Sequence, residues 1–202
     1  MKSLMAISVS VAFTIGSWVA TAKAGDAEGL TVTDLSVYKA VLTSHCKSEG
    51  GHYSVLSSNT SGPPAHFPDK GMYTSALIDL KQRASVESRI PFSVDCAGVT
   101  VAEQQTIQKA FASGASTPPN SIPGMATTAT WRGFYRTFPG ARDLMTLSKP
   151  GYAQSGEVAL VYISQECGGL CGYSQYITLR RINGEWKISD DFHGERSYGV
   201  GE

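Results

Sequence analysis

Residues 175–189, QYITLRRINGEWKIS, decide the fold class of this sequence. Two runs rich in β-branched and aromatic residues, 175–182 and 185–189, flank the dipeptide Asn183-Gly184. Because both residues of the dipeptide tolerate the positive φ angles of a type I′ turn, the stretch predicts a tight β-hairpin. We therefore expect these two strands to pair antiparallel.

The segments before the hairpin continue the β pattern. Residues 144–148 and 158–164 are short apolar runs bounded by turn residues. Together with the two strands of the hairpin they predict four successive strands. A C-terminal antiparallel meander is therefore expected.

The N-terminal half mixes helix and strand signals. Apolar residues recur at three- and four-residue spacing from Asp34 to His45, which predicts a helix, and a mixed pattern predicts another at 72–83. Short strands are expected at 52–58 and 90–94. The predicted fold class is α+β, with N-terminal helices and short strands packed on the C-terminal antiparallel meander.

Two further features lie between these halves. Thr100 and Glu103 have the spacing of a capping box, which predicts that a helix starts at Thr100 and closes at Gly114. The composition then shifts to Pro, Ser and Thr, so a surface loop is expected at about 113–130.

Four aromatic residues follow at helical spacing: Trp131, Phe134, Tyr135 and Phe138. They predict a short helix that ends at Pro139. Core packing is the favoured interpretation, because aromatic side chains dominate buried area. The alternative is a binding surface formed by Trp131, Phe134 and Tyr135.

Residues 1–24 have the features of a secretory signal peptide: a lysine near the start, a long apolar run, and Ala22-Lys23-Ala24 as a small-residue cleavage site. Residues 25–202 are then expected to form a single α+β domain. The protein is expected in the periplasm or the medium, because no cysteine stands at the cleavage point for lipid attachment.

The charge balance excludes some partners. The sequence has 17 basic and 17 acidic residues, and removing Lys2 and Lys23 with the signal peptide leaves 15 basic against 17 acidic. A nucleic-acid binder needs a dense basic face, so none is predicted. The mature part also lacks an apolar run of the roughly 18 to 20 residues that a membrane span requires, so we expect it to be soluble.

The four cysteines, Cys46, Cys96, Cys167 and Cys171, are expected to form two disulfides, because an exported chain folds where thiols are oxidised. Of the three pairings that four cysteines allow, we favour Cys46 with Cys96 and Cys167 with Cys171, since the close pair needs only a turn. The predicted domain is therefore braced by disulfides. A thiol-redox role for Cys167 and Cys171 is the alternative, although three residues rather than two separate them.

The search for catalytic groups yields little. Ser44 and Lys47 match a Ser-x-x-Lys pattern, but the companion elements of penicillin-recognising enzymes are missing. An unpaired Cys46 could act as a nucleophile with His52 or His66 as its base. The histidines have no paired metal-ligand spacing, so neither a metal nor a cofactor is predicted.

The C-terminal part resembles a family of uncharacterised exported bacterial proteins. The matching residues are Trp131, Phe134-Tyr135, Phe138-Pro139-Gly140, Leu147-Ser148, Gly151-Tyr152, Ala159-Leu160-Val161-Tyr162, Cys167-Gly168-Gly169-Leu170-Cys171-Gly172, Tyr176, Leu179, Gly184 and Trp186-Lys187. The resemblance implies export, and the family has no established activity to transfer.

These observations favour a non-enzymatic exported protein that binds a partner in the cell envelope. An inhibitor or immunity role is one form of this hypothesis. Binding is expected through the proline-rich loops at 62–68 and 118–123 or through the aromatic residues at 131–135, because recognition residues collect on loops of a rigid scaffold. The alternatives are an envelope-acting hydrolase with His52 or His66 as base and a thiol-disulfide oxidoreductase.

Overall fold

The computed structural model describes residues 29–46, 52–62, 73–91, 97–115, 126–168 and 172–189. Within these ranges the chain forms four helices and a curled mixed sheet of seven strands, which confirms the α+β class. The predicted signal peptide, Cys96, Cys171, His66 and the proline-rich loops beyond Gly62 lie outside the described residues. No helix in the described ranges is both long enough and apolar enough to cross a membrane.

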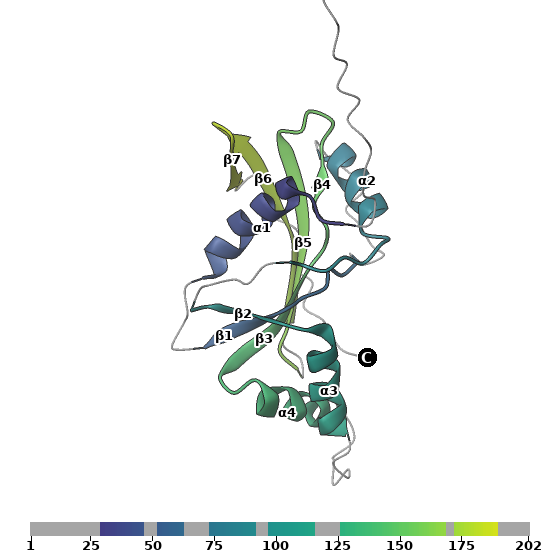
Figure 1. Cartoon of the computed structure of the whole chain (residues 1–202), viewed down its shortest axis with the longest axis vertical. Helices are drawn as coiled ribbons and strands as arrows, with labels where there is room; N and C mark the ends of the chain where they lie inside the picture. The colour runs from purple at the N-terminus through teal and green to yellow at the C-terminus, as the bar shows by residue number, and fades with distance from the viewer. Residues whose placement is uncertain are drawn as a thin grey trace, which may run out of the picture.

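The elements are, in chain order, α1 (Val32–His45), β1 (Tyr53–Ser57), α2 (Thr74–Arg83), β2 (Val99–Ala102), α3 (Gln104–Ala115), α4 (Ala126–Thr137), β3 (Ala141–Leu147), β4 (Gly151–Tyr152), β5 (Val158–Glu166), β6 (Gly172–Ile182) and β7 (Glu185–Ile188). The strand order is β2-β1-β3-β5-β6-β7, and β4 also pairs with β5. Figure 1 shows α1 lying across the sheet, α3 and α4 side by side at one end of the molecule, and α2 beside β4 toward the other.

The predicted hairpin and meander are confirmed. Strands β6 and β7 pair antiparallel with Leu179 opposite Ile188, and β3, β5 and β6 are also antiparallel neighbours. Asn183 and Gly184 have φ angles of 53° and 83°, as the turn requires.

The placement of the N-terminal strands was predicted wrongly. Instead of packing on the meander, β1 and β2 extend its sheet: β1 pairs in parallel with both β2 and β3. Helices α2, α3 and α4 lie in the connections between these strands, and such long crossovers permit parallel pairing. Most of the strand predicted at 90–94 lies outside the described residues. Its described residues, Ile90 and Pro91, are not in a strand, and they follow Arg89, which forms an isolated bridge with Asn59.

Helix α1 starts at a capping box that we did not predict. The Thr31 hydroxyl accepts from the Asp34 amide at 3.1 Å, and the Thr31 amide donates to Asp34 Oδ2 at 2.7 Å. The box predicted at Thr100 is wrong, because Thr100 lies in β2 and α3 starts only at Gln104. The β-branched residues around Thr100 pair with β1, and this strand pairing outweighs the local capping pattern.

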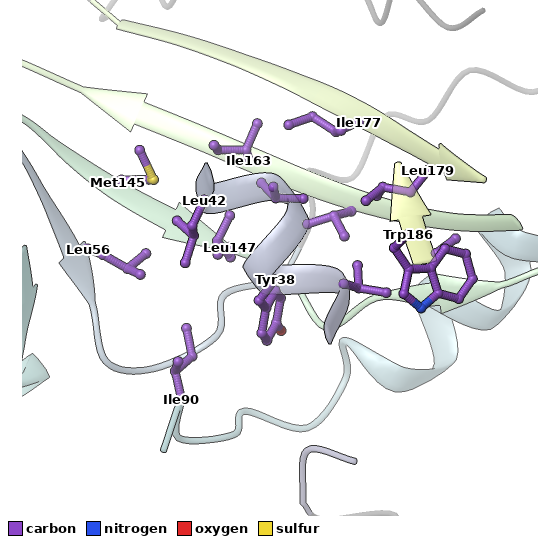
Figure 2. Packing of buried hydrophobic residues seen from close by; sticks show 14 of the residues in the cluster. Tyr38, Leu42, Leu56, Ile90, Met145, Leu147, Ile163, Ile177, Leu179 and Trp186 are labelled. Carbon is purple, nitrogen blue, oxygen red and sulfur yellow. The ribbon is translucent and has the colours of Figure 1, made fainter. Parts of the chain in front are cut away.

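The apolar side of α1 forms the main core. Figure 2 shows Tyr38 and Leu42 among side chains from β1, β3, β5 and β6, with Trp186 of β7 at one side. Val55 belongs to a second core with α3 and α4, whereas its neighbour Leu56 belongs to the α1 core. Since successive strand residues point to opposite faces, helices cover both faces of the sheet.

Helices α3 and α4 shorten the predicted loop. Residues at both ends of the expected 113–130 segment are helical, so only 116–125 separate the helices, and these lie outside the described residues. A Cβ atom on Gly133 would lie 2.2 Å from the Ala110 carbonyl oxygen. Glycine at this position therefore allows the two helices to pack closely.

Candidate functional site

A polar groove of about 290 Å³ lies where the parallel strands end. Its lining residues are Ser57, Asn59, Thr60, Ser61, Gly62, Ala84, Ser85, Glu87, Gln104 and Thr146. Ser57 ends β1, Thr146 is the penultimate residue of β3, and Gln104 opens α3 just after β2. The carboxyl ends of parallel strands are a common place for ligands in α/β sheets, so this position favours a binding site. We call these ten residues the strand-end groove.

Hydrogen bonds between lining residues fix the shape of the groove. Ser57 Oγ donates to Gln104 Oε1 at 2.8 Å and accepts from the Asn59 amide at 3.3 Å. Asn59 Nδ2 in turn donates to Glu87 Oε1 at 2.8 Å. The segment after β1, the loop after α2 and the start of α3 are thus joined by polar contacts. Such a site is organised before any ligand arrives.

Several polar groups of the groove remain available to a ligand. Three groups make no hydrogen bond among the described residues: the side-chain amide NH2 of Gln104, the Thr146 hydroxyl and the Ser61 hydroxyl. Glu87 is exposed and uses one carboxylate oxygen for Asn59. The groove therefore offers hydroxyl and amide groups together with one carboxylate.

Sequence reasoning missed most of this site. Only Gly62 belongs to a predicted binding segment, the proline-rich loop at 62–68, and the lining residues from α2 onward lie far from it in the sequence. Thr60 is buried, and its amide donates to the Ser88 carbonyl at 2.8 Å. The run of small polar residues directly after a strand was the available signal, because small polar side chains suit both turns and binding sites.

The aromatic residues of α4 pack in a core, as the favoured interpretation of their spacing predicted. Phe134 is fully buried, and Phe111 stacks on its ring with a centroid distance of 5.3 Å. Trp131 and Tyr135 are only partly exposed and pack against the same cluster. The helical spacing places these rings against β1 and α3, so Phe134 is closed to a ligand, and a binding surface at the partly exposed Trp131 and Tyr135 stays a prediction.

The same aromatic residues support the start of the cysteine turn. The Tyr135 hydroxyl donates to the Cys167 carbonyl at 2.6 Å, and a Cβ on Gly168 would lie 2.5 Å from the Trp131 indole. Burial and the charge of Asp143 raise the pKa of Tyr135, so its hydroxyl stays a donor. Trp131, Tyr135 and Cys167, which we predicted as separate features, thus meet in one structural unit.

The remaining predicted groups do not line the strand-end groove. His52 is exposed at the start of β1, with Nδ1 3.3 Å from the Gly140 carbonyl oxygen, whereas the strand-end groove lies at the other end of β1. Neither Cys46 nor Cys167 is a free thiol. Lys47 lies outside the described residues. Because the Cys46 thiol is not free, it is not available as a nucleophile with His52 as its base.

A buried ion pair joins α1 to α2. Arg83 binds both carboxylate oxygens of Asp34, and the Tyr152 hydroxyl donates to Asp34 Oδ1 at 2.8 Å. Burial alone would raise the pKa of Asp34, but the hydrogen bonds from Arg83, the Thr31 amide and Tyr152 outweigh it and lower the pKa. Burial and the Asp34 charge raise the pKa of Tyr152. All polar atoms of this carboxylate are used, so its role is structural.

A second buried polar group lies between β1, β3 and β5. Arg142 Nε donates to Asp143 Oδ2 at 2.9 Å, and Gln165 Nε2 lies 3.4 Å from the same oxygen. Asp143 Oδ1 and Gln165 Oε1 are buried without a hydrogen-bond partner in the described chain. A flipped Gln165 amide would place its oxygen beside the carboxylate, so the observed orientation is the favourable one. An unmet buried acceptor of this kind costs about 1 to 3 kcal/mol.

Comparisons with protein-family models, curated proteins and solved structures found no match.

Proposed function

We propose that the chain is an exported, non-enzymatic protein that binds a protein partner in the cell envelope, with the strand-end groove as its binding site. An inhibitor or immunity role is one form of this function. The preorganised groove at the ends of the parallel strands is the observation that carries the proposal. It combines a fixed shape with polar groups that have no partner among the described residues.

The chemistry of the groove supports binding rather than catalysis. The side chains that line it are Ser, Thr, Asn, Gln and one Glu, together with Gly62 and Ala84. Covalent catalysis needs a nucleophile activated by a neighbouring base. Ser57 instead donates its proton to the Gln104 amide oxygen, which is too weak a base to activate it.

Disulfide bracing is part of the proposal, with Cys46 bound to Cys96 and Cys167 bound to Cys171. The Gly98 amide donates to the Cys46 carbonyl at 3.1 Å, so the chain two residues beyond Cys96 passes beside Cys46. Intact mass before and after alkylation counts the free thiols. Two disulfides predict none, and four free thiols would contradict the bracing.

Export is supported by the signal-peptide features of residues 1–24. Fractionation of expressing cells, with the mass of the mature chain, tests this part. A mature mass that starts near Gly25 in the periplasm or medium is expected. A full-length chain retained in the cytoplasm would contradict it.

Photo-crosslinking tests the binding site. A photoreactive residue at Ser61, in the groove, is compared with one at Lys109, an exposed position on α3 outside it. A defined adduct with an envelope protein is expected from Ser61 alone. Thr146→Val, which replaces the hydroxyl by a methyl group of similar size, should weaken it. Equal adducts from both positions would contradict the site. Hydrolysis of envelope material that is abolished by His52→Ala would favour the hydrolase instead.

A further inference from the structure

We infer that the occupant of the strand-end groove is an extended peptide segment carrying a lysine or arginine that pairs with Glu87. This inference rests on the proposed function and specifies the partner's chemistry. It is carried by the charges around the groove and by the hydrogen-bonding groups that remain available in it.

Glu87 is the charged residue of the lining. Asn59 Nδ2 donates to its Oε1 atom, which holds the carboxylate at the groove while the side chain stays exposed. Glu87 forms no ion pair with any residue in the described ranges. Nearby Glu103, in contrast, is already paired with Arg89. A cationic side chain from a partner could therefore form an ion pair with Glu87.

The other available groups suit a peptide backbone. The side-chain amide NH2 of Gln104 can donate to a carbonyl oxygen, and the Thr146 and Ser61 hydroxyls can accept from backbone amides. Backbone groups alternate donor and acceptor along an extended segment, so one short stretch can use all three. The cavity volume of about 290 Å³ is near the lower bound for ligand pockets, which favours a short segment over a larger molecule.

A carbohydrate fits the lining less well. Sugar faces are apolar and pack on aromatic rings, and none of the lining residues is aromatic. A nucleotide or other anion would meet the carboxylate of Glu87 without a compensating cation in the lining. A cationic peptide is therefore the occupant that the groove chemistry selects.

Peptide titrations followed by NMR test the inference on the purified full chain. The probes are the capped pentapeptides Gly-Ser-X-Ser-Gly, with Lys, Arg, Ala or Glu at X. The Lys and Arg peptides are expected to shift the side-chain amide resonances of Gln104 at lower concentration than the Ala peptide. The Glu peptide should bind most weakly. Because an exposed ion pair contributes about 0.2 to 1 kcal/mol, the Lys peptide should bind about 1.4 to 5 times more tightly than the Ala peptide.

Glu87→Gln is the decisive variant. Its amide oxygen can still accept from Asn59 Nδ2, so the groove keeps its shape while the charge is removed. The preference for Lys over Ala should disappear in this variant and persist in Glu157→Gln, which neutralises an exposed glutamate outside the groove. Equal binding of all four peptides would contradict the requirement for a basic residue, although the groove would still be a peptide-binding site. Absence of any Gln104 shift would overturn the peptide inference, whereas the proposed function is decided separately by crosslinking from Ser61.

Discussion

Arg83 binds Asp34 through two contacts, Nη1 to Oδ1 at 2.9 Å and Nη2 to Oδ2 at 2.7 Å, across 49 positions of sequence. The same Nη1 atom donates to the Pro150 carbonyl at 2.6 Å, and the guanidinium lies 5.2 Å from the Tyr152 ring centroid. One side chain thus joins the start of α1, the end of α2 and the region of β4. Asp34 is fully buried, so loss of this pair should be costly.

Replacing Asp34 by Asn should lower the free energy of unfolding by about 3 kcal/mol, because it leaves a partly buried guanidinium without its counter-charge. Urea unfolding measures the loss. Arg83→Met alone should also destabilise the protein, and the double variant should be less destabilised than the sum of the two single losses. Additive effects would show that the pair contributes no coupling energy. Glu157→Gln, an exposed carboxylate, should stay within about 0.5 kcal/mol of the wild type.

The lowered pKa of Asp34 predicts a loss of stability in acid. A carboxyl group whose pKa is lower in the folded state contributes stability above its unfolded pKa, and this contribution disappears as the pH falls through the folded pKa. The difference in unfolding free energy between the wild type and Asp34→Asn should therefore be full near neutral pH and shrink below about pH 4. A difference that stays constant down to about pH 2 would contradict the assignment.

Gly168→Ala should destabilise the protein far more than Gly156→Ala. Both glycines have positive φ angles, 80° and 71°, but a Cβ on Gly168 would meet the Trp131 indole at 2.5 Å, whereas a Cβ on Gly156 meets nothing within 4 Å. Placing an alanine at a positive φ angle should cost about 1 kcal/mol of stability at each position. Overpacking against the indole should cost about 1 to 3 kcal/mol more at Gly168. Thermal unfolding of both variants separates the two causes. Equal losses would show that the indole moves aside.

Gln165→Met should leave the stability unchanged within about 1 kcal/mol or raise it. The substitution removes a buried amide whose oxygen has no partner in the described chain and whose Nε2 contacts are long, at 3.4 and 3.5 Å. Gln165→Glu keeps the shape but places a second carboxylate beside Asp143, so it should destabilise at neutral pH and recover in acid. A large loss in Gln165→Met would reveal that the amide has a partner, such as an ordered water.

The sequence predicted best the elements that depend on neighbouring residues. The β6–β7 hairpin was predicted because Asn183 and Gly184 both favour the positive φ angles of its turn. Helix α1 was predicted because the spacing of its apolar residues can be read within one short segment. The parallel pairing of β1 with β3 was not predictable from pattern alone. The two strands are separated by α2, β2, α3 and α4, and apolar alternation does not identify a strand's partner.

The candidate site escaped prediction for a related reason. Ser57, Glu87, Gln104 and Thr146 carry no recognisable motif, and only the sheet topology and the helix positions bring them together. The aromatic residues were easier to predict. Their spacing from Trp131 identified a helix face, and this face packs in the core as the favoured interpretation expected.

The contact between α1 and the end of the sheet has a consequence for how the chain folds. Tyr38 and Leu42, near the N-terminus, share a core with Leu179 and Trp186 from the last two strands. The apolar side of α1 therefore cannot be covered completely until β6 and β7 have been made. Contacts that are so distant in sequence slow folding and delay it until the whole chain is present. A ribosome-bound or truncated chain that ends before β6 should thus remain unfolded and accessible to proteases, whereas the complete chain resists them.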